Sequence, residues 1–139
     1  MIKQIFIDTS AFYALMDRSD QYHNQAKNFW SIILNKEILL NTSNYIIMET
    51  GALVQNRLGF NAADIWYRDI LGVIDVLWIK ETAHQMAYEL WLNMGKKKLS
   101  LVDCVSFITM RSHQIETVFG FDKHFKNQGF IMFGLDKSI

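Results

Sequence analysis

The chain has 139 residues, of which 50% are hydrophobic and 14% aromatic, so a disordered protein is excluded. This length suffices for one hydrophobic core and is short for two, which predicts a single domain over residues 1–139. Fourteen basic and fourteen acidic residues cancel, which argues against a protein that binds nucleic acid by bulk charge alone.

The cysteine content and the hydropathy favour a cytoplasmic protein without membrane contact. Cys104 is the single cysteine, so an intrachain disulfide is excluded and we expect a buried thiol. No apolar run approaches the ~20 residues that span a bilayer. No charged and then apolar leader precedes Asp8.

The first predicted element is a buried strand. Residues 5–7 form a continuous apolar run, which is typical of a strand covered on both faces of a parallel sheet. Asp8 follows at the carboxyl end of this strand, where open parallel sheets bind ligands. Asp8, Thr9 and Ser10 are also ordinary capping residues for a helix at residues 11–16. The residues alone leave both interpretations of Asp8 open.

Strands and helices then alternate to the C-terminus. Periodicity predicts helices at residues 22–35, from the Thr42 and Ser43 caps to Gly59, at 61–71, from the Thr82 cap to Gly95, and at 104–114. Apolar runs predict strands at residues 38–40, 76–79, 117–121 and 131–133. The first two strands are separated by more than the about twelve residues that a parallel crossover needs. We expect an α/β fold with a central, mostly parallel β-sheet of about five strands flanked by helices.

Glu49 is a charged residue at the edge of an apolar helix face. It lies three residues after Ile46 and four before Leu53. We expect it to be half in the core, where a lone carboxylate is costly to desolvate. A cation should therefore lie beside it, unless the side chain reaches solvent or pairs with Arg57 or Arg68.

Two later acids also have structural explanations. Ser100 and Asp103 have the spacing of a capping box, so Asp103 is accounted for as a helix N-terminal acid. Asp122 follows the strand at residues 117–121, as Asp8 follows the first strand. The lysines at 96–98 form an exposed loop, which is either a solvated turn or a contact to phosphate groups.

Four acids are expected to converge at one edge of the sheet: Asp8, Glu49, Asp103 and Asp122. Strands of a parallel sheet end at one edge, and the helices that follow them begin there. Two carboxylates ~5 Å apart repel by roughly 3 kcal/mol at an effective dielectric of about 20. Such a cluster needs bound cations, or some of its acids must be protonated.

The chemistry of this cluster favours a magnesium or manganese site. Hard oxygen ligands without accompanying histidine or cysteine select Mg²⁺ or Mn²⁺ over zinc, and such ions are recurrent in phosphodiester cleavage. No histidine has the spacing of a zinc motif, and the sequence contains no glycine-rich phosphate loop or nucleophile elbow. Nucleoside-triphosphate and serine-hydrolase chemistry therefore rank low.

Successive short motifs resemble those of the PIN-domain ribonucleases, in particular the VapC-type toxins. They are Ile-Phe-Ile-Asp8-Thr-Ser10-Ala-Phe, the helix of Asp20 and His23, Glu49-Thr50, Leu99-Ser100-Leu-Val-Asp103-Cys, and Phe119-Gly-Phe-Asp122-Lys-His124-Phe125. The resemblance implies a three-layer PIN-like fold and a Mg²⁺- or Mn²⁺-dependent endoribonuclease acting on structured RNA such as tRNA or rRNA. It also implies a homodimer and a cognate antitoxin that blocks the site.

Residue roles carry over onto matching positions only. The catalytic and metal-binding acids would be Asp8, Glu49, Asp103 and Asp122, supported by the hydroxyls of Ser10 and Ser100. Substrate phosphates would be bound by Lys96, Lys97, Lys98 and Lys123. Many relatives carry Thr or Ser two residues before the last acid, and Gly120 departs from that pattern.

Two other functions remain open at this stage. One is a PIN nuclease of RNA processing that has no antitoxin. The other is an inactive PIN module that binds RNA or protein, although such a module would normally lose an acid, and all four are present. Independently, the aromatics of residues 60–71 and of Phe29 and Trp30 exceed what one small core needs, which predicts self-association.

Overall fold

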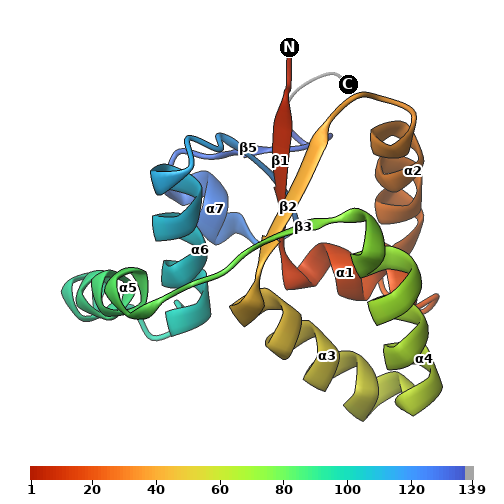
Figure 1. Ribbon diagram of the computed structural model, residues 1–139, viewed down its shortest axis with the longest axis horizontal. Coiled ribbons are helices and arrows are strands. Elements are labelled where there is room, and N and C mark those ends of the chain that lie inside the picture. The colour runs from red at the N-terminus through yellow and green to blue at the C-terminus, as the bar shows by residue number, and fades with distance from the viewer. Residues whose placement is uncertain (137–139) are drawn as a thin grey trace.

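The structure, a computed structural model, describes residues 1–136, in which a five-stranded sheet lies between groups of helices (Figure 1). The strands are β1 (Gln4–Ile7), β2 (Leu39–Ser43), β3 (Asp75–Leu77), β4 (Thr117–Phe119) and β5 (Ile131–Met132). The helices are α1 (Thr9–Met16), α2 (His23–Leu34), α3 (Asn44–Leu58), α4 (Phe60–Ile65), α5 (Glu81–Met94), α6 (Leu101–Ser112) and α7 (Lys123–Asn127). The last three residues of the predicted domain lie outside the described residues.

The sheet is parallel throughout, whereas the sequence predicts a mostly parallel one. Its strand order is β3-β2-β1-β4-β5, so β1 is central and pairs with both β2 and β4. In Figure 1, α2 and α4 lie on one side of the strands and α6 and α7 on the other. Because parallel strands end at one edge, the residues after β1 and β4 are brought side by side there.

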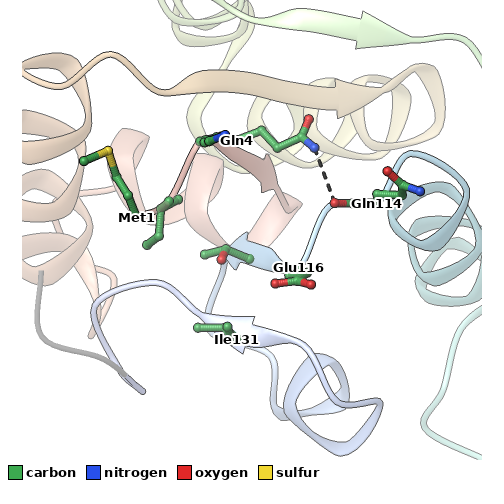
Figure 2. Close-up of a pocket in the computed structure, with 8 residues that line it drawn as sticks. Met1, Gln4, Gln114, Glu116 and Ile131 are labelled. Atoms are coloured by element: carbon green, nitrogen blue, oxygen red, sulfur yellow. Dashed lines mark hydrogen bonds between the residues drawn. The ribbon is translucent and has the colours of Figure 1, made fainter.

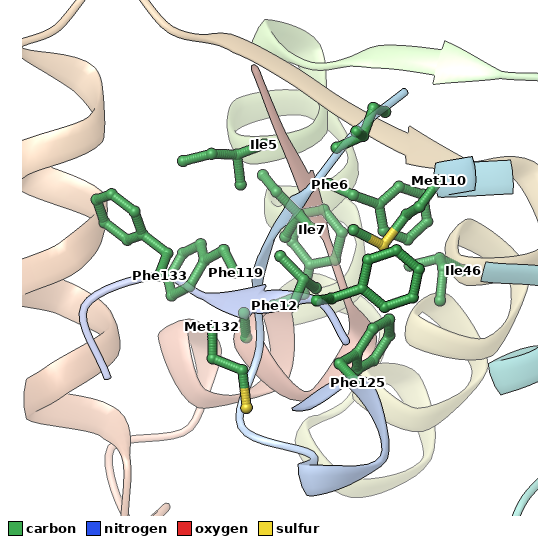
Figure 3. Packing of buried hydrophobic residues seen from close by; sticks show 14 of the residues in the cluster. Ile5, Phe6, Ile7, Phe12, Ile46, Met110, Phe119, Phe125, Met132 and Phe133 are labelled. Carbon is green, nitrogen blue, oxygen red and sulfur yellow. The ribbon is translucent and has the colours of Figure 1, made fainter. Parts of the chain in front are cut away.

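The core explains why β1 is apolar without interruption. Ile5, Phe6 and Ile7 have no exposed surface, because helices cover both faces of the sheet. Around them pack side chains from the other strands and from several helices, including Phe12, Ile46, Met110, Phe119, Phe125 and Phe133 (Figure 3). Cys104 is a buried free thiol, as expected. None of the helices within residues 1–136 is long and apolar enough to cross a membrane.

Several element boundaries differ from the predicted ones. The fourth helix is shorter than residues 61–71, because α4 gives way to a π-helical turn at Trp66–Ile70 and a 3-10 turn at Leu71–Val73. The third strand ends at Leu77, and Trp78 is 68% exposed. The last predicted strand, 131–133, stops at Met132. Apolar periodicity places such elements but fixes their ends poorly.

Three predicted helix starts are also corrected. Thr42 does not cap α3, because its hydroxyl donates to the Ile7 carbonyl across the sheet, and Ser43 alone is the cap. Thr82 lies inside α5, which begins after Lys80 without a side-chain cap. The helix predicted from residue 104 begins at Leu101, directly after the Ser100 cap.

The aromatic argument for self-association is partly wrong. Phe29 is buried and packs against Phe119 and Phe133, and Trp66 is buried against Phe12. These rings therefore belong to the core of the chain itself.

Candidate functional site

All four predicted acids and both predicted serines line one cleft, at the carboxyl edge of the sheet. The cleft has a volume of about 740 Å³ and is lined by Asp8, Thr9, Ser10, Glu49, Ala52, Leu53, Asn56, Ser100, Asp103 and Asp122. The acids come from four separate places in the chain, so their meeting in one cleft results from the fold.

Asp8 is both a helix cap and a wall of the cleft. It follows β1 directly and is the N-cap of α1, where its Oδ2 accepts hydrogen bonds from the Ser10 backbone N–H and hydroxyl at 3.2 and 2.7 Å. Burial raises the pKa of the Asp8 carboxyl to about 7, against the lowering effect of these hydrogen bonds. The charges of Asp103 and Glu49 raise it further. Without a cation, this carboxyl therefore binds a proton near neutral pH.

Ser10 connects the ends of the two central strands. Its hydroxyl donates to Asp8 and accepts from the backbone N–H of Phe121, after β4, at 2.9 Å. A Cβ at Gly120 would lie 3.0 Å from the Asp8 Cβ and 3.2 Å from the Ser10 Oγ. The chain passes so close to the Asp8 and Ser10 pair here that a side chain at this position would press on both. The glycine that departs from the family pattern therefore fits this packing.

Asp103 is a capping-box acid that also lies in the cleft wall. The capping box is confirmed: the Ser100 hydroxyl accepts from the Asp103 backbone N–H, and the Asp103 carboxylate accepts from the Ser100 backbone N–H, both at 3.1 Å. The carboxylate is at the same time half-buried in the cleft wall. Burial raises its pKa, and the Asp122 charge adds to the rise.

Asp122 lies near the end of β4, although not where the sequence predicts. The strand ends at Phe119 rather than at residue 121, and Asp122 is the N-cap of α7, a short helix that the sequence does not predict. Its Oδ1 accepts from the His124 backbone N–H at 2.9 Å.

His124 is a site residue that the sequence does not predict. Its Nε2 lies 3.9 Å from the Asp122 carboxylate, and possible ligand atoms of Asp103, Asp122 and His124 all lie within 4.8 Å of one another. The available signal is its position two residues after an N-cap acid, within the first turn of α7. Three donors at this spacing can hold one metal ion.

Glu49 is exposed, which agrees with the solvent alternative and corrects the expectation that it lies half in the core. The buried face of α3 follows Ile46, Thr50 and Val54, and Glu49 lies off that stripe and on the cleft wall. Neither predicted arginine pairs with it. Arg68 binds Asp64 at 3.1 Å, and Arg57 lies over the ring of Tyr13.

The donor set fits a hard divalent cation. Within residues 1–136, Asp122 forms an ion pair with His124, and the other three acids form none. Carboxylate oxygens are ligands for Mg²⁺ and Mn²⁺, whereas the imidazole of His124 is a ligand that other divalent metals also accept. Burial is the main cause of the raised pKa values of Asp8 and Asp103, and the charges of neighbouring acids add to the rise.

The opposite edge of the sheet offers a different environment. A hollow of about 320 Å³ there is lined by Met1, Gln4, Gln114, Glu116 and Ile131, among others (Figure 2). The Gln4 amide donates to the Gln114 carbonyl at 3.4 Å. Glu116 is its single acid, so this hollow lacks the ligands for a similar site.

The predicted substrate lysines are exposed and do not line the acid cleft. Lys96, Lys97 and Lys98 are exposed in the loop after α5, and Lys123 is exposed at the start of α7. The Lys98 carbonyl oxygen lies 3.1 Å from the His124 Nε2, so this loop contacts the site through its backbone.

Comparisons with known proteins show the family. The family model described as PIN domain matches residues 5–131. The chain is 32% identical over 128 residues to the 23S rRNA-specific endonuclease VapC20 of two Mycobacterium tuberculosis strains, covering 91% of this chain and 95% of the relative.

Two solved structures have the same fold as this chain. The crystal structure of Mycobacterium tuberculosis VapC20, described as a sarcin-ricin loop cleaving toxin, matches with a TM-score of 0.82 and 30% identity over 91% of this chain and 96% of that one. The DNA-bound VapBC of Salmonella typhimurium matches with a TM-score of 0.65 and 14% identity, over 95% and 97% of the two chains, and so shows the shared fold.

Proposed function

The chain belongs to the PIN-domain family, and from this premise we propose that it is a metal-dependent endoribonuclease that cleaves ribosomal RNA as the toxin of a toxin–antitoxin pair. The observation that carries the proposal is the single cleft lined by Asp8, Glu49, Asp103 and Asp122. The activity named for the 32% identical relative supports ribosomal RNA over tRNA as the substrate.

Within this proposal, the acids bind Mg²⁺ or Mn²⁺ over the cleft. Asp103, Asp122 and His124, whose possible ligand atoms lie together, would hold the ion with Asp8 of the same cleft. When bound, the ion supplies a Lewis acid that lowers the pKa of a water molecule and stabilises the leaving oxygen. Ser10 holds the Asp8 carboxylate, and Ser100 holds that of Asp103, so that both acids are oriented in advance.

Substrate binding requires local positive charge, because the chain is neutral overall. Lys96, Lys97, Lys98 and Lys123 supply it beside the cleft and would bind the RNA backbone. A cognate antitoxin would inhibit the enzyme by covering the cleft. The similarity to VapC20, which is itself a toxin, supports such a partner.

Cleavage-site mapping tests this function. Purified protein incubated with ribosomes and Mg²⁺ should cut 23S rRNA at one or a few positions, seen as discrete primer-extension stops. Asp103→Asn should leave the rRNA intact, since it removes one metal ligand while an asparagine can still accept from the Ser100 backbone N–H. Intact rRNA with the wild-type protein, or equal cutting by the variant, would contradict the proposal.

We also propose that the protein is a homodimer. Phe60 and Tyr67 remain 70% and 57% exposed, and such apolar surface is typical of subunit contacts. Light scattering at micromolar concentration should report twice the mass of the 16.3 kDa chain. Phe60→Ser combined with Tyr67→Ser should lower that mass. A wild-type protein that stays monomeric over the same range would rule the dimer out.

A further inference from the structure

The C-terminal end of α5 forms a second hollow next to the acid cleft. It has a volume of about 330 Å³ and is lined by Trp91, Leu92, Gly95, Lys96, Lys97 and Leu99. Leu99 lines this hollow, and Ser100, the next residue, lines the acid cleft. A polymer bound in the cleft can therefore extend into the hollow, whose size is that of a small-ligand site.

Trp91 presents a partly exposed and oriented indole to this hollow. It is 37% exposed, and its Nε1 donates to the Leu99 carbonyl at 3.1 Å, which satisfies the one polar atom of the ring. Tyr88, one turn earlier on α5, lies with its ring centre 6.0 Å away. An aromatic ring held in this way is the kind of surface on which nucleobases stack.

The charge of the hollow fits a polyanion. Lys96 and Lys97 line it, and no acid does. Within the described part of the chain, no ion pair includes either lysine, so both ammonium groups are free to bind phosphate. An apolar peptide carries no group that binds these two cations, whereas an RNA strand can stack on the ring and bind both cations through its phosphates.

The loop between the hollow and the cleft is fixed at both ends. Trp91 binds the Leu99 carbonyl, and the Lys98 carbonyl lies 3.1 Å from the His124 Nε2 in the acid site. The capping box of Ser100 and Asp103 continues the same chain into α6. The aromatic hollow is thus tied to the acids through a few backbone contacts.

We infer, on the basis of the proposed nuclease function, that Trp91 stacks on a nucleobase next to the cleaved phosphodiester while Lys96 and Lys97 bind the adjacent phosphates. The hollow is then the subsite that positions the RNA strand over the acids, and it recognises an unpaired base by its aromatic face.

The test uses a hairpin RNA that carries the mapped cleavage site, with each flanking nucleotide replaced in turn by an abasic one. Trp91→Leu should lower kcat/KM on the intact hairpin by about 5- to 150-fold, the effect of losing one stacked base. One abasic replacement should lower the kcat/KM of wild type by a similar factor. It should leave the kcat/KM of Trp91→Leu unchanged, because the two changes remove the same contact.

Two variants of aromatic residues serve as controls for Trp91→Leu. Trp91→Phe keeps a ring and should retain most activity. Trp78→Leu changes an exposed indole that lines neither the hollow nor the cleft, and should cleave like wild type. Equal losses for Trp91→Leu on the intact hairpin and on every abasic hairpin would overturn the inference. So would unchanged cleavage by Trp91→Leu together with a change of oligomeric mass, which would make this face a protein interface.

Hairpin binding, measured by fluorescence anisotropy of labelled RNA, separates the subsite from the activity. The pair Lys96→Gln and Lys97→Gln should reduce the slope of log affinity against log salt by about 1.4, since two phosphate contacts are lost. An unchanged slope would overturn their assignment. A wild-type protein that cleaves no RNA, but binds a labelled single-stranded RNA more tightly than Trp91→Leu does, would refute the nuclease proposal and leave the subsite standing.

Discussion

Chelation of divalent cations with EDTA should abolish RNA cleavage, and addition of excess Mg²⁺ or Mn²⁺ should restore it. Four carboxylates line one cleft, and at ~5 Å each pair repels by roughly 3 kcal/mol at an effective dielectric of about 20. Neither Asp8 nor Asp103 has an arginine or lysine partner among the ion pairs of residues 1–136. We therefore expect a bound cation to compensate the acids and, as proposed, to activate water.

A melting curve provides the control for this result. Millimolar Mg²⁺ should raise the melting temperature of the wild-type protein above its value in EDTA, because a ligand at a hundredfold excess over Kd stabilises by about 2.7 kcal/mol. Asp103→Asn should show a smaller rise. Cleavage that persists in EDTA, in a preparation whose Asp103→Asn variant is inactive, would contradict the metal requirement.

The fold could be predicted well from local patterns. The uninterrupted apolar run of β1 predicts burial on both faces, and Ile5, Phe6 and Ile7 are fully buried. The Gly59 stop of α3 and the Ser100 capping box were also predicted, because these signals depend on neighbouring residues alone. Features set by distant contacts were missed, such as the end of β4 and the short helix α7.

The same distinction applies to the site. The parallel order of strands predicts that Asp8 and Asp122 share an edge, and both line the cleft. The environment of each acid depends on tertiary packing. Glu49 was expected to be half in the core and is exposed, and the proximity of His124 to Asp103 follows from how α7 packs beside α6. The role of these residues as metal ligands stays a prediction.

Asp8→Asn should lower RNA cleavage by about 100-fold or more, and in EDTA it should raise the melting temperature. The loss of activity follows from the loss of one acid of the metal site, whose catalytic effect is worth several kcal/mol. The gain in stability follows from burial, which raises the pKa of the Asp8 carboxyl from 3.8 to about 7. Asparagine is an equally good N-cap, so α1 keeps its first hydrogen bond.

The pH dependence of the wild-type protein follows from the raised pKa of Asp8, which fixes the sign of the change in the free energy of unfolding. Below about pH 4, Asp8 is protonated in both the folded and the unfolded chain. Between pH 4 and 7, the unfolded chain releases this proton while the folded chain retains it, so the free energy of unfolding falls as the pH rises. By pH 8 the free energy of unfolding has fallen by on the order of 4 kcal/mol because of this group. The Asp8→Asn variant is uncharged at this position and escapes the cost, so its melting temperature should vary less over this range.

Asp17→Asn is the matched control, with the opposite expected sign. Asp17, at the other end of α1, accepts hydrogen bonds from the Tyr13 hydroxyl and the Ser19 backbone N–H, and the Tyr13 bond lowers its pKa. The stability from this group is present above its unfolded pKa and is lost as the pH falls, so Asp17→Asn should melt lower than wild type at pH 8.

In excess Mg²⁺, the melting temperature of wild type should rise more than that of Asp8→Asn, because only wild type retains the full set of acids. An Asp8→Asn protein that melts below wild type at pH 8 in EDTA, with an equal gain from Mg²⁺, would show that Asp8 is a helix cap and no part of a metal site.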